Sequence, residues 1–552
     1  MTRLGILAGL MVASFCAIPA RARAQPNDAR TELARGISAL HEFEYEDASD
    51  AFTRARTLDP GLAMAYWGEA MSYHQSLWNR ENLDAARAAL ARFGPTPTAR
   101  AAKCKVPKDA GLLAAADALF GAGTLQDRRR MYADAMRGLH ERFPDDPDIA
   151  AFYGLALLAT TTRGLIGTAD HDAHPAGLAG SEIQRRVGEL LEAVLASHPG
   201  HRGALHYLLH NFDDPEHAVR ALKTARAYAT IASASHARHM PAHIFLQLGL
   251  WEEAAAADRV AYDASVEWTT RRGLSAGVRN YHALSWHEYE LLQLGRYRDA
   301  EQTLHTLEPL ASRGDNLILL NDYASMRARF VVETERWDLM AGQTTFTNVN
   351  DLFAVGLSVA HLGRRSDAER VHSLLAQRAQ AMEEGDLRPA IAIMERELAA
   401  AIAAADGRTD EAIATLSAAA RAELALPPPV GLPQPIKPAP EMLGELLVTS
   451  GRPGDAIEWF ERALRRNANR SPSVAGLARA RAAIQTSTAP PPSTRHSLKV
   501  VPYTSRALAL GSVLAAVLVA VVVMRRRAKK KGPAPVKGAG PKASAKRRRQ
   551  KR

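Results

Sequence analysis

The chain has 552 residues, of which 47% are hydrophobic and 23% charged, proportions typical of folded rather than disordered proteins. Alanine and arginine are abundant and aromatic residues make up only 6%, which favours helices over strands. Fourteen Lys and Arg residues follow residue 524, and without them the net charge of +11 becomes −3, so nucleic-acid binding is not expected for the rest of the chain.

Residues 1–24 have the features of a secretory signal peptide. Arg3 supplies a positive start, an apolar run extends from about Leu4 to Ile18, and the small-residue pattern ARA at 22–24 precedes a cleavage position. The apolar run is too short for a lasting membrane span. We therefore expect an exported chain that begins near residue 25.

The body, residues 25–484, repeats one pattern of small and large side chains. In the first copy, Gly36 and Ala48 are small where two antiparallel helices cross, Phe52 fills the space beneath them, and Pro60 ends the second helix. Self-similarity at a fixed period is typical of helical repeat proteins. The clearest copies lie near residues 29–62, 235–268, 281–312, 349–380, 393–424 and 437–470.

This pattern resembles the tetratricopeptide repeat (TPR) superfamily. Phrases such as HYLLH and HMPAHIF are similar to those of exported bacterial TPR proteins of mostly undefined function. The resemblance implies an all-α fold, a right-handed superhelical array of helix-turn-helix repeats whose concave groove binds a protein or peptide. Residues 75–200 depart from the repeat frame but still have a helical pattern. The proline-rich segment 427–440 is expected to be an extended loop laid over the array.

Histidines are concentrated in the middle of the body. Twelve of the nineteen lie between His171 and His287. The segments HYLLH and HARHMPAH each place two histidines four residues apart, on one face of a helix. Within HARHMPAH, Pro241 predicts either a kink or the start of a helix.

One hypothesis is that these histidines line the groove. If Gly249 is counted as position 15 of its repeat, the three histidines of HARHMPAH take positions 2, 5 and 9, which the TPR resemblance implies are ligand-facing. The alternative within this hypothesis is that they hydrogen-bond neighbouring repeats. The predicted partner-binding residues are His236, His239, His243, His282, Glu441 and Glu445.

The other hypothesis is a metal site, used for binding or for metal-dependent hydrolysis. Two histidines four residues apart can present nitrogens to one ion such as Zn²⁺, with Asp213, Asp214 or Glu288 as supporting carboxylates. No HExxH motif, phosphate loop or nucleophile elbow is present, so no catalytic residue is predicted and no other cofactor is expected. The predicted metal-binding residues are His206, His210, His239, His243, His282 and His287.

The C-terminal end predicts a membrane anchor. Residues 485–505 form a stalk rich in Pro, Ser and Thr, and residues 506–524 form an apolar run long enough to span a bilayer. Residues 525–552 are strongly basic, which places them in the cytoplasm by the positive-inside rule. The sequence therefore predicts a single-pass protein of the bacterial cell membrane, with a periplasmic repeat domain that acts as a scaffold for a protein or peptide partner.

Overall fold

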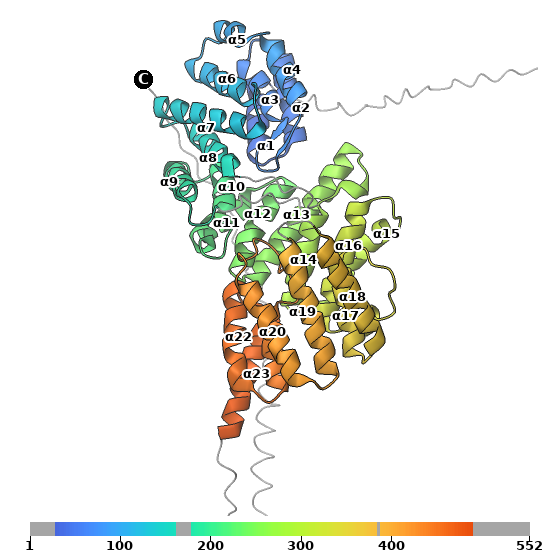
Figure 1. Ribbon diagram of the computed structural model, residues 1–552. Coiled ribbons are helices and arrows are strands. Elements are labelled where there is room, and N and C mark those ends of the chain that lie inside the picture. Colours follow the sequence, from blue (N-terminus) through green and yellow to red (C-terminus); the bar gives the residue numbers. More distant parts are fainter. Residues whose placement is uncertain (1–27, 162–177, 383–386, 489–552) are drawn as a thin grey trace, which may run out of the picture. The chain divides into compact units, whose positions relative to one another are not determined.

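The computed structural model describes residues 28–161, 178–382 and 387–488. These residues form an almost entirely helical protein, which confirms the all-α prediction for this part of the chain (Figure 1). No helix within the described ranges is long and apolar enough to cross a membrane. The predicted signal peptide, the predicted transmembrane segment 506–524 and the basic tail lie outside them.

The first half of the body contains a short hairpin as well as helices. In this hairpin, β1 and β2 pair antiparallel, with His74 opposite Glu81. The elements in chain order are α1 (Ala29–His41), α2 (Tyr45–Leu58), α3 (Ala63–Met71), β1 (His74–Gln75), β2 (Arg80–Glu81), α4 (Leu83–Phe93), α5 (Pro97–Lys103), α6 (Pro107–Leu119), α7 (Leu125–Arg142), α8 (Pro147–Thr161), α9 (Glu182–Ser197), α10 (Arg202–Asn211) and α11 (Ala218–Ile231).

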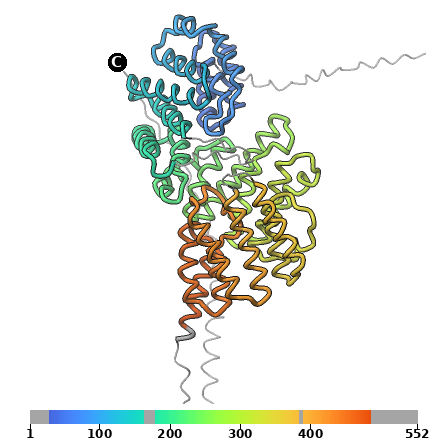
Figure 2. The backbone as a smooth tube through the Cα atoms, viewed as in Figure 1, coloured from blue at the N-terminus to red at the C-terminus, as the bar shows by residue number. Residues whose placement is uncertain are grey.

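The second half contains α-helices and two short 3₁₀ helices, η1 and η2. Figure 2 shows the chain running back and forth, with each helix beside the next. The elements are α12 (Ser235–Gln247), α13 (Trp251–Arg272), η1 (Ala276–Val278), α14 (Tyr281–Gln293), α15 (Tyr297–Ala311), α16 (Leu317–Thr334), η2 (Trp337–Leu339), α17 (Val349–His361), α18 (Arg365–Ala381), α19 (Leu387–Ala405), α20 (Thr409–Leu424), α21 (Ala439–Thr449), α22 (Pro453–Arg466) and α23 (Ser471–Thr488).

Each of the six ranges picked out in the sequence contains two consecutive helices that pack on each other. The packing follows the predicted sizes of the side chains. A Cβ atom on Gly36 or Gly68 would lie within 2.7 Å of the ring of Phe52, and Gly444 and Gly476 hold Phe460 in the same way, within 2.8 Å. Glycine is needed on both sides of these rings because the helices approach too closely for a methyl group.

Most helix pairs are joined through a left-handed residue. Five glycines take this position, with φ between 64° and 76°: Gly249, Gly295, Gly363, Gly407 and Gly451. Glycine adopts this conformation without the steric cost that a Cβ brings. In the turn between α1 and α2, Phe43 adopts φ 61° instead, at a cost of about 1–3 kcal/mol. Its ring reaches the histidines of α10 and α12.

Residues 427–438 of the proline-rich segment form a loop that lies against α12 and α14, whereas the last two residues of the predicted loop, Ala439 and Pro440, begin α21. The Gln247 side chain donates hydrogen bonds to the carbonyl oxygens of Pro429 (3.3 Å) and Val430 (3.0 Å). Gly431 touches the indole of Trp286, where an added Cβ would lie 2.9 Å from the ring. This loop therefore covers one side of the histidine-bearing helices.

Candidate functional site

Helix α12 carries three of the clustered histidines and continues through its proline. It runs from Ser235 to Gln247, with Pro241 buried in its interior. Of the two alternatives predicted for Pro241, a kink or the start of a helix, the second is wrong, because α12 begins at Ser235. Proline lacks an N–H group and therefore leaves the carbonyl of Ala237, one turn earlier, without its usual helical partner.

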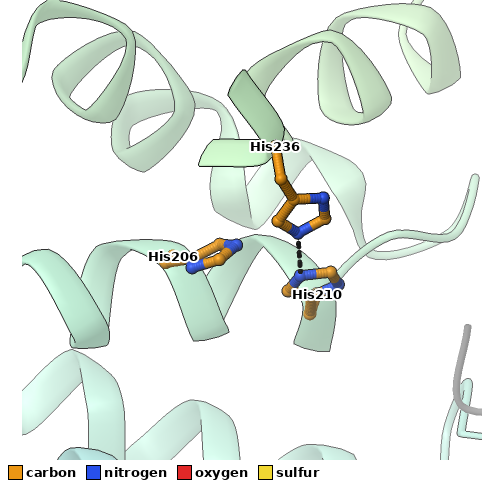
Figure 3. A group of neighbouring side chains, drawn as sticks. All are labelled: His206, His210 and His236. Carbon is orange, nitrogen blue, oxygen red and sulfur yellow. Dashed lines mark hydrogen bonds between the residues drawn. The ribbon is translucent and has the colours of Figure 1, made fainter. Parts of the chain in front are cut away.

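His206 and His210 of α10 meet His236 of α12 in a group that we call the α10–α12 cluster (Figure 3). Each residue offers one ring nitrogen, and these three atoms lie within 4.8 Å of one another. The Nε2 atoms of His210 and His236 are 3.3 Å apart. The ring of Phe43 packs beside them, with its centroid 4.5 Å from that of His206 and 5.6 Å from that of His236.

His206 has one defined tautomer. Its Nδ1 atom lies 2.7 Å from the main-chain oxygen of His41, and because a carbonyl only accepts, Nδ1 carries the hydrogen. The Nε2 atom then bears a lone pair, and it is buried without a hydrogen-bond partner among the described residues. Burial lowers the pKa of His206 to about 4, so its imidazole is neutral at pH 7.

His239 and His243 of α12 meet His282 of α14 in a second group, the α12–α14 cluster. Here too one nitrogen of each ring lies within 4.8 Å of the others. The Nε2 atoms of His239 and His243 face each other at 2.9 Å, and both residues are fully buried. Trp286 packs against all three rings, with centroid distances of 4.9 Å, 4.3 Å and 5.3 Å to His239, His243 and His282.

Buried carboxylates lie behind two rings of the α12–α14 cluster. The Nδ1 atom of His239 bonds Asp258 of α13, and the Nδ1 atom of His243 lies 2.7 Å from Asp213, which follows α10. Asp258 is fully buried and Asp213 nearly so. Glu290 of α14 is buried next to Asp258, and its burial together with this like charge raises the pKa of Glu290 well above its usual value.

A third group joins distant parts of the chain. The Nε2 atoms of His41 and His201 lie 3.0 Å and 3.1 Å from the same carboxylate oxygen of Asp148. The Nδ1 atom of His41 lies 2.9 Å from the hydroxyl of Tyr207. Both nitrogens of His41 are therefore engaged within the chain, which is typical of a structural network that ties α1 to α8 and α10.

The structure divides the histidines predicted to bind one metal ion between two clusters, with His206 and His210 in the first and His239, His243 and His282 in the second. His287 lies on α14 but belongs to neither cluster, and burial lowers its pKa to about 4. Of the three carboxylates predicted to support a metal, Asp213 contacts His243. Asp214 bonds His217 and Gln184 instead, and Glu288 accepts a hydrogen bond from Arg329 at 2.9 Å.

Several residues predicted to face an open groove are buried instead. Glu441 is fully buried because the Arg470 guanidinium binds both of its carboxylate oxygens, at 2.8 Å and 3.0 Å. His239 and His243 are fully buried under Trp286. The exposure expected from the repeat frame is thus not observed for these three residues, because contacts from other parts of the chain cover them.

Glu445, in contrast, lies on the wall of a hollow of about 470 Å³. The hollow crosses the first helices of three successive pairs, α17, α19 and α21, and most of its wall is apolar. The apolar residues are Trp337, Leu357, Ala360, Ala400, Ala401, Ala404, Ala405, Leu416, Met442, Leu446, Val448 and Phe460. The polar ones are Glu335, His361, Lys437, Glu445, Thr449 and Arg479.

Two residues that contact the α12–α14 cluster, Asp258 and Trp286, were not predicted from the sequence. Asp258 lies on the buried stripe of α13, four residues after Ala254 and three before Ala261, both fully buried. An acidic residue on an apolar helical stripe is a detectable signal. Trp286 follows His282 by four residues, so the helical period of α14 places it on the same face.

No protein-family model matches the chain, and a search of curated proteins finds no match. Among solved structures, the chain is similar to the P58(IPK) TPR domain, with 15% identity over 84% of this chain and 99% of that one and a TM-score of 0.24. It is also similar to yeast Tom70 (10% identity, 84% and 90%, TM-score 0.28) and to the human IFIT1 dimer with m7Gppp-AAAA (14%, 80% and 95%, TM-score 0.31).

Proposed function

We propose that the protein is a scaffold that binds a polypeptide partner in the hollow across α17, α19 and α21. The observation that supports this proposal is the hollow itself, because its wall is built from the first helices of three successive pairs. Stacked helix pairs present such a continuous surface to a ligand. Glu445, one of the residues predicted to meet a partner, is part of this wall.

The wall favours a peptide that inserts apolar side chains and carries an acidic group nearby. The alanines of α19 leave the floor open, and Trp337, stacked on His361 with ring centroids 4.4 Å apart, forms a flat apolar edge. Apolar side chains that fill this space stabilise the complex by about 25 cal/mol for each Å² of apolar surface that they remove from water. At the rim, Arg479 is exposed and makes no ion pair with the described residues, so its guanidinium is available to a carboxylate.

Peptide selection on the full chain tests this proposal. Peptides from a displayed random library are selected on the immobilised protein, and their affinities are measured by fluorescence anisotropy. Ala404→Arg, which places a long charged side chain in the hollow, should weaken the selected peptides at least about tenfold. The matched control is Ala229→Arg on an exposed face of α11. Equal affinity for both variants would exclude the hollow as the binding surface.

We also propose that the body is exported and anchored in a bacterial membrane by residues 506–524, with the basic tail in the cytoplasm. The pattern of apolar and basic residues at both ends supports this arrangement. Protease added outside spheroplasts should digest the body and leave a short C-terminal fragment. Survival of the body in intact spheroplasts, with digestion only after lysis, would contradict export.

A further inference from the structure

In the α12–α14 cluster, the Nε2 atoms of His239 and His243 face each other at 2.9 Å. The Nδ1 atoms of His239 and His243 contact the carboxyl groups of Asp258 and Asp213. An ionised carboxylate only accepts hydrogen bonds, so with both acids ionised both Nδ1 atoms carry hydrogen. In a neutral imidazole the other nitrogen then bears a lone pair. Two such lone pairs, on Nε2 atoms 2.9 Å apart, repel each other unless a cation lies between them.

That cation is either a proton or a metal ion, and the third histidine distinguishes the two. A shared proton needs only two nitrogens, whereas His282 brings a third nitrogen within 4.8 Å of the pair. Two nitrogens bound to one zinc ion at 2.0–2.1 Å in tetrahedral geometry are separated by about 3.3 Å. A small opening of the 2.9 Å pair would reach this separation.

We propose that His239, His243 and His282 bind one divalent transition-metal ion of the zinc class. Neutral imidazole nitrogens are preferred ligands of zinc, copper, nickel and iron rather than of calcium or magnesium. The three residues supply three ligands, and a water molecule completes the tetrahedron.

The surroundings of the cluster match what a metal-bound histidine requires. A ligating imidazole usually donates its other N–H group to a carboxylate or carbonyl, which fixes the ring and increases its basicity. Asp258 contacts Nδ1 of His239 in this way, and Asp213 contacts Nδ1 of His243. The two carboxylates come from two other segments of the chain. Both carboxylates are buried, so a divalent cation held by the two rings balances their charge.

The position of the cluster assigns the ion a structural role. The ligands come from α12 and α14, and the supporting carboxylates come from α13 and from the segment after α10. One ion therefore ties together four parts of the array. None of these residues lies on the wall of the peptide-binding hollow, so loss of either function leaves the other testable.

The first experiment measures zinc binding to the full chain. The protein is stripped of metal with a chelator, dialysed, and titrated with Zn²⁺ by calorimetry, and with Co²⁺ by visible absorption. We expect one ion per chain and the intense visible bands of tetrahedral Co²⁺. Absence of stoichiometric binding by either ion would overturn the proposal, and a downfield NMR signal from a hydrogen shared between the two Nε2 atoms would identify a proton in its place.

Variants in and around the cluster then locate the ion. His282→Ala removes a ligand from α14 and should weaken Zn²⁺ binding on the order of 100-fold, and Asp258→Asn should weaken it about 10–100-fold. The matched control is His287→Ala, which removes another buried histidine of α14 that is outside the cluster. Circular dichroism checks that each variant is folded. Binding that survives His282→Ala, or that is lost only in His206→Ala of the other cluster, would overturn the assignment.

Discussion

The two histidine clusters that share α12 differ in the group that contacts the Nδ1 atoms of their imidazoles. In the α10–α12 cluster, Nδ1 of His206 faces the main-chain carbonyl of His41. In the α12–α14 cluster, the Nδ1 atoms of His239 and His243 face buried carboxylates. A carbonyl fixes the tautomer and leaves the ring neutral, whereas a carboxylate also stabilises positive charge on or beside the ring. The first cluster thus contains a neutral histidine, His206, whereas the surroundings of the second favour a cation.

Burial alone does not explain this difference, because each cluster contains two buried histidines and one that is partly buried. The rings of each are covered by an aromatic side chain, Phe43 for the α10–α12 cluster and Trp286 for the α12–α14 cluster. His206 and His243 are both fully buried. The difference therefore lies in the charge of the group that contacts Nδ1, a carbonyl in one cluster and carboxylates in the other. Variants that change the pH response, the charge or the packing can test this explanation.

The largest expected effect is the loss of stability in acid caused by His206. Its pKa is about 4 in the native protein and about 6.5 in an unfolded chain, so as pH falls through this window the unfolded chain binds a proton that the native protein does not. Between pH 7 and pH 4.5 this one residue should lower the free energy of unfolding by roughly 2.5 kcal/mol. His206→Gln should reduce the acid loss by that amount in urea titrations at the two pH values.

An exposed histidine provides the control for this measurement. His198→Gln, at the end of α9, should show the same difference between pH 7 and pH 4.5 as the unmodified protein. If His206→Gln also keeps the full difference, His206 does not remain neutral in the native state. The contrast between a neutral His206 and a cation-favouring α12–α14 cluster would then be lost.

The next effect concerns the carboxylate behind His243. Asp213→Asn keeps the shape of the side chain but removes its charge, and hydrogen bonds to charged groups contribute about 1.5–3 kcal/mol. We therefore expect a loss of about 2 kcal/mol in the free energy of unfolding at pH 7. Asp263→Asn, in an exposed ion pair with Arg259, should cost at most about 0.5 kcal/mol. Equal costs would show that the charge of Asp213 does not stabilise the α12–α14 cluster.

A smaller effect is expected from the packing of His41, whose carbonyl holds His206. A Cβ atom added to Gly203 would lie 2.2 Å from Nδ1 of His41, so Gly203→Ala must displace that ring. Overpacking of a core costs about 1–3 kcal/mol, and we expect about 1.5 kcal/mol by urea denaturation. Gly200→Ala is the matched control, because nothing lies within 4 Å of its added Cβ. No difference between the two would show that His41 moves freely.

The fold was predictable because its rules are local. The size pattern of Gly36, Ala48 and Phe52 describes two helices in contact, and the same contact recurs at Gly444 and Phe460. Glycines such as Gly249 mark the turns because only they adopt positive φ at little cost. Phe43 breaks this rule, and the reason is a contact with α10 and α12 that no local pattern reveals.

The sequence predicted which histidines form the candidate site, but not how they divide into two clusters. Sequence spacing showed that His239 and His243 share a helical face, and the structure adds His282 to them. It could not show that His236, one turn earlier, meets α10 instead, because that depends on how α12 sits between its two neighbours. The burial of Glu441 on α21 likewise depends on Arg470, which lies after α22 and donates hydrogen bonds to the Glu441 carboxylate.

The smallest effect concerns the contact between Tyr207 and His41, the residue whose main-chain carbonyl bonds His206. Tyr207→Phe keeps a buried ring and removes only the hydroxyl that contacts Nδ1 of His41, so we expect a cost of about 1 kcal/mol, against none for the exposed Tyr297→Phe. Combined with Gly203→Ala, it should cost less than the sum of the single changes, because both act on the same imidazole. Strict additivity would mean that the Tyr207 hydroxyl does not hold His41, and that the carbonyl behind His206 is fixed by the end of α1 itself.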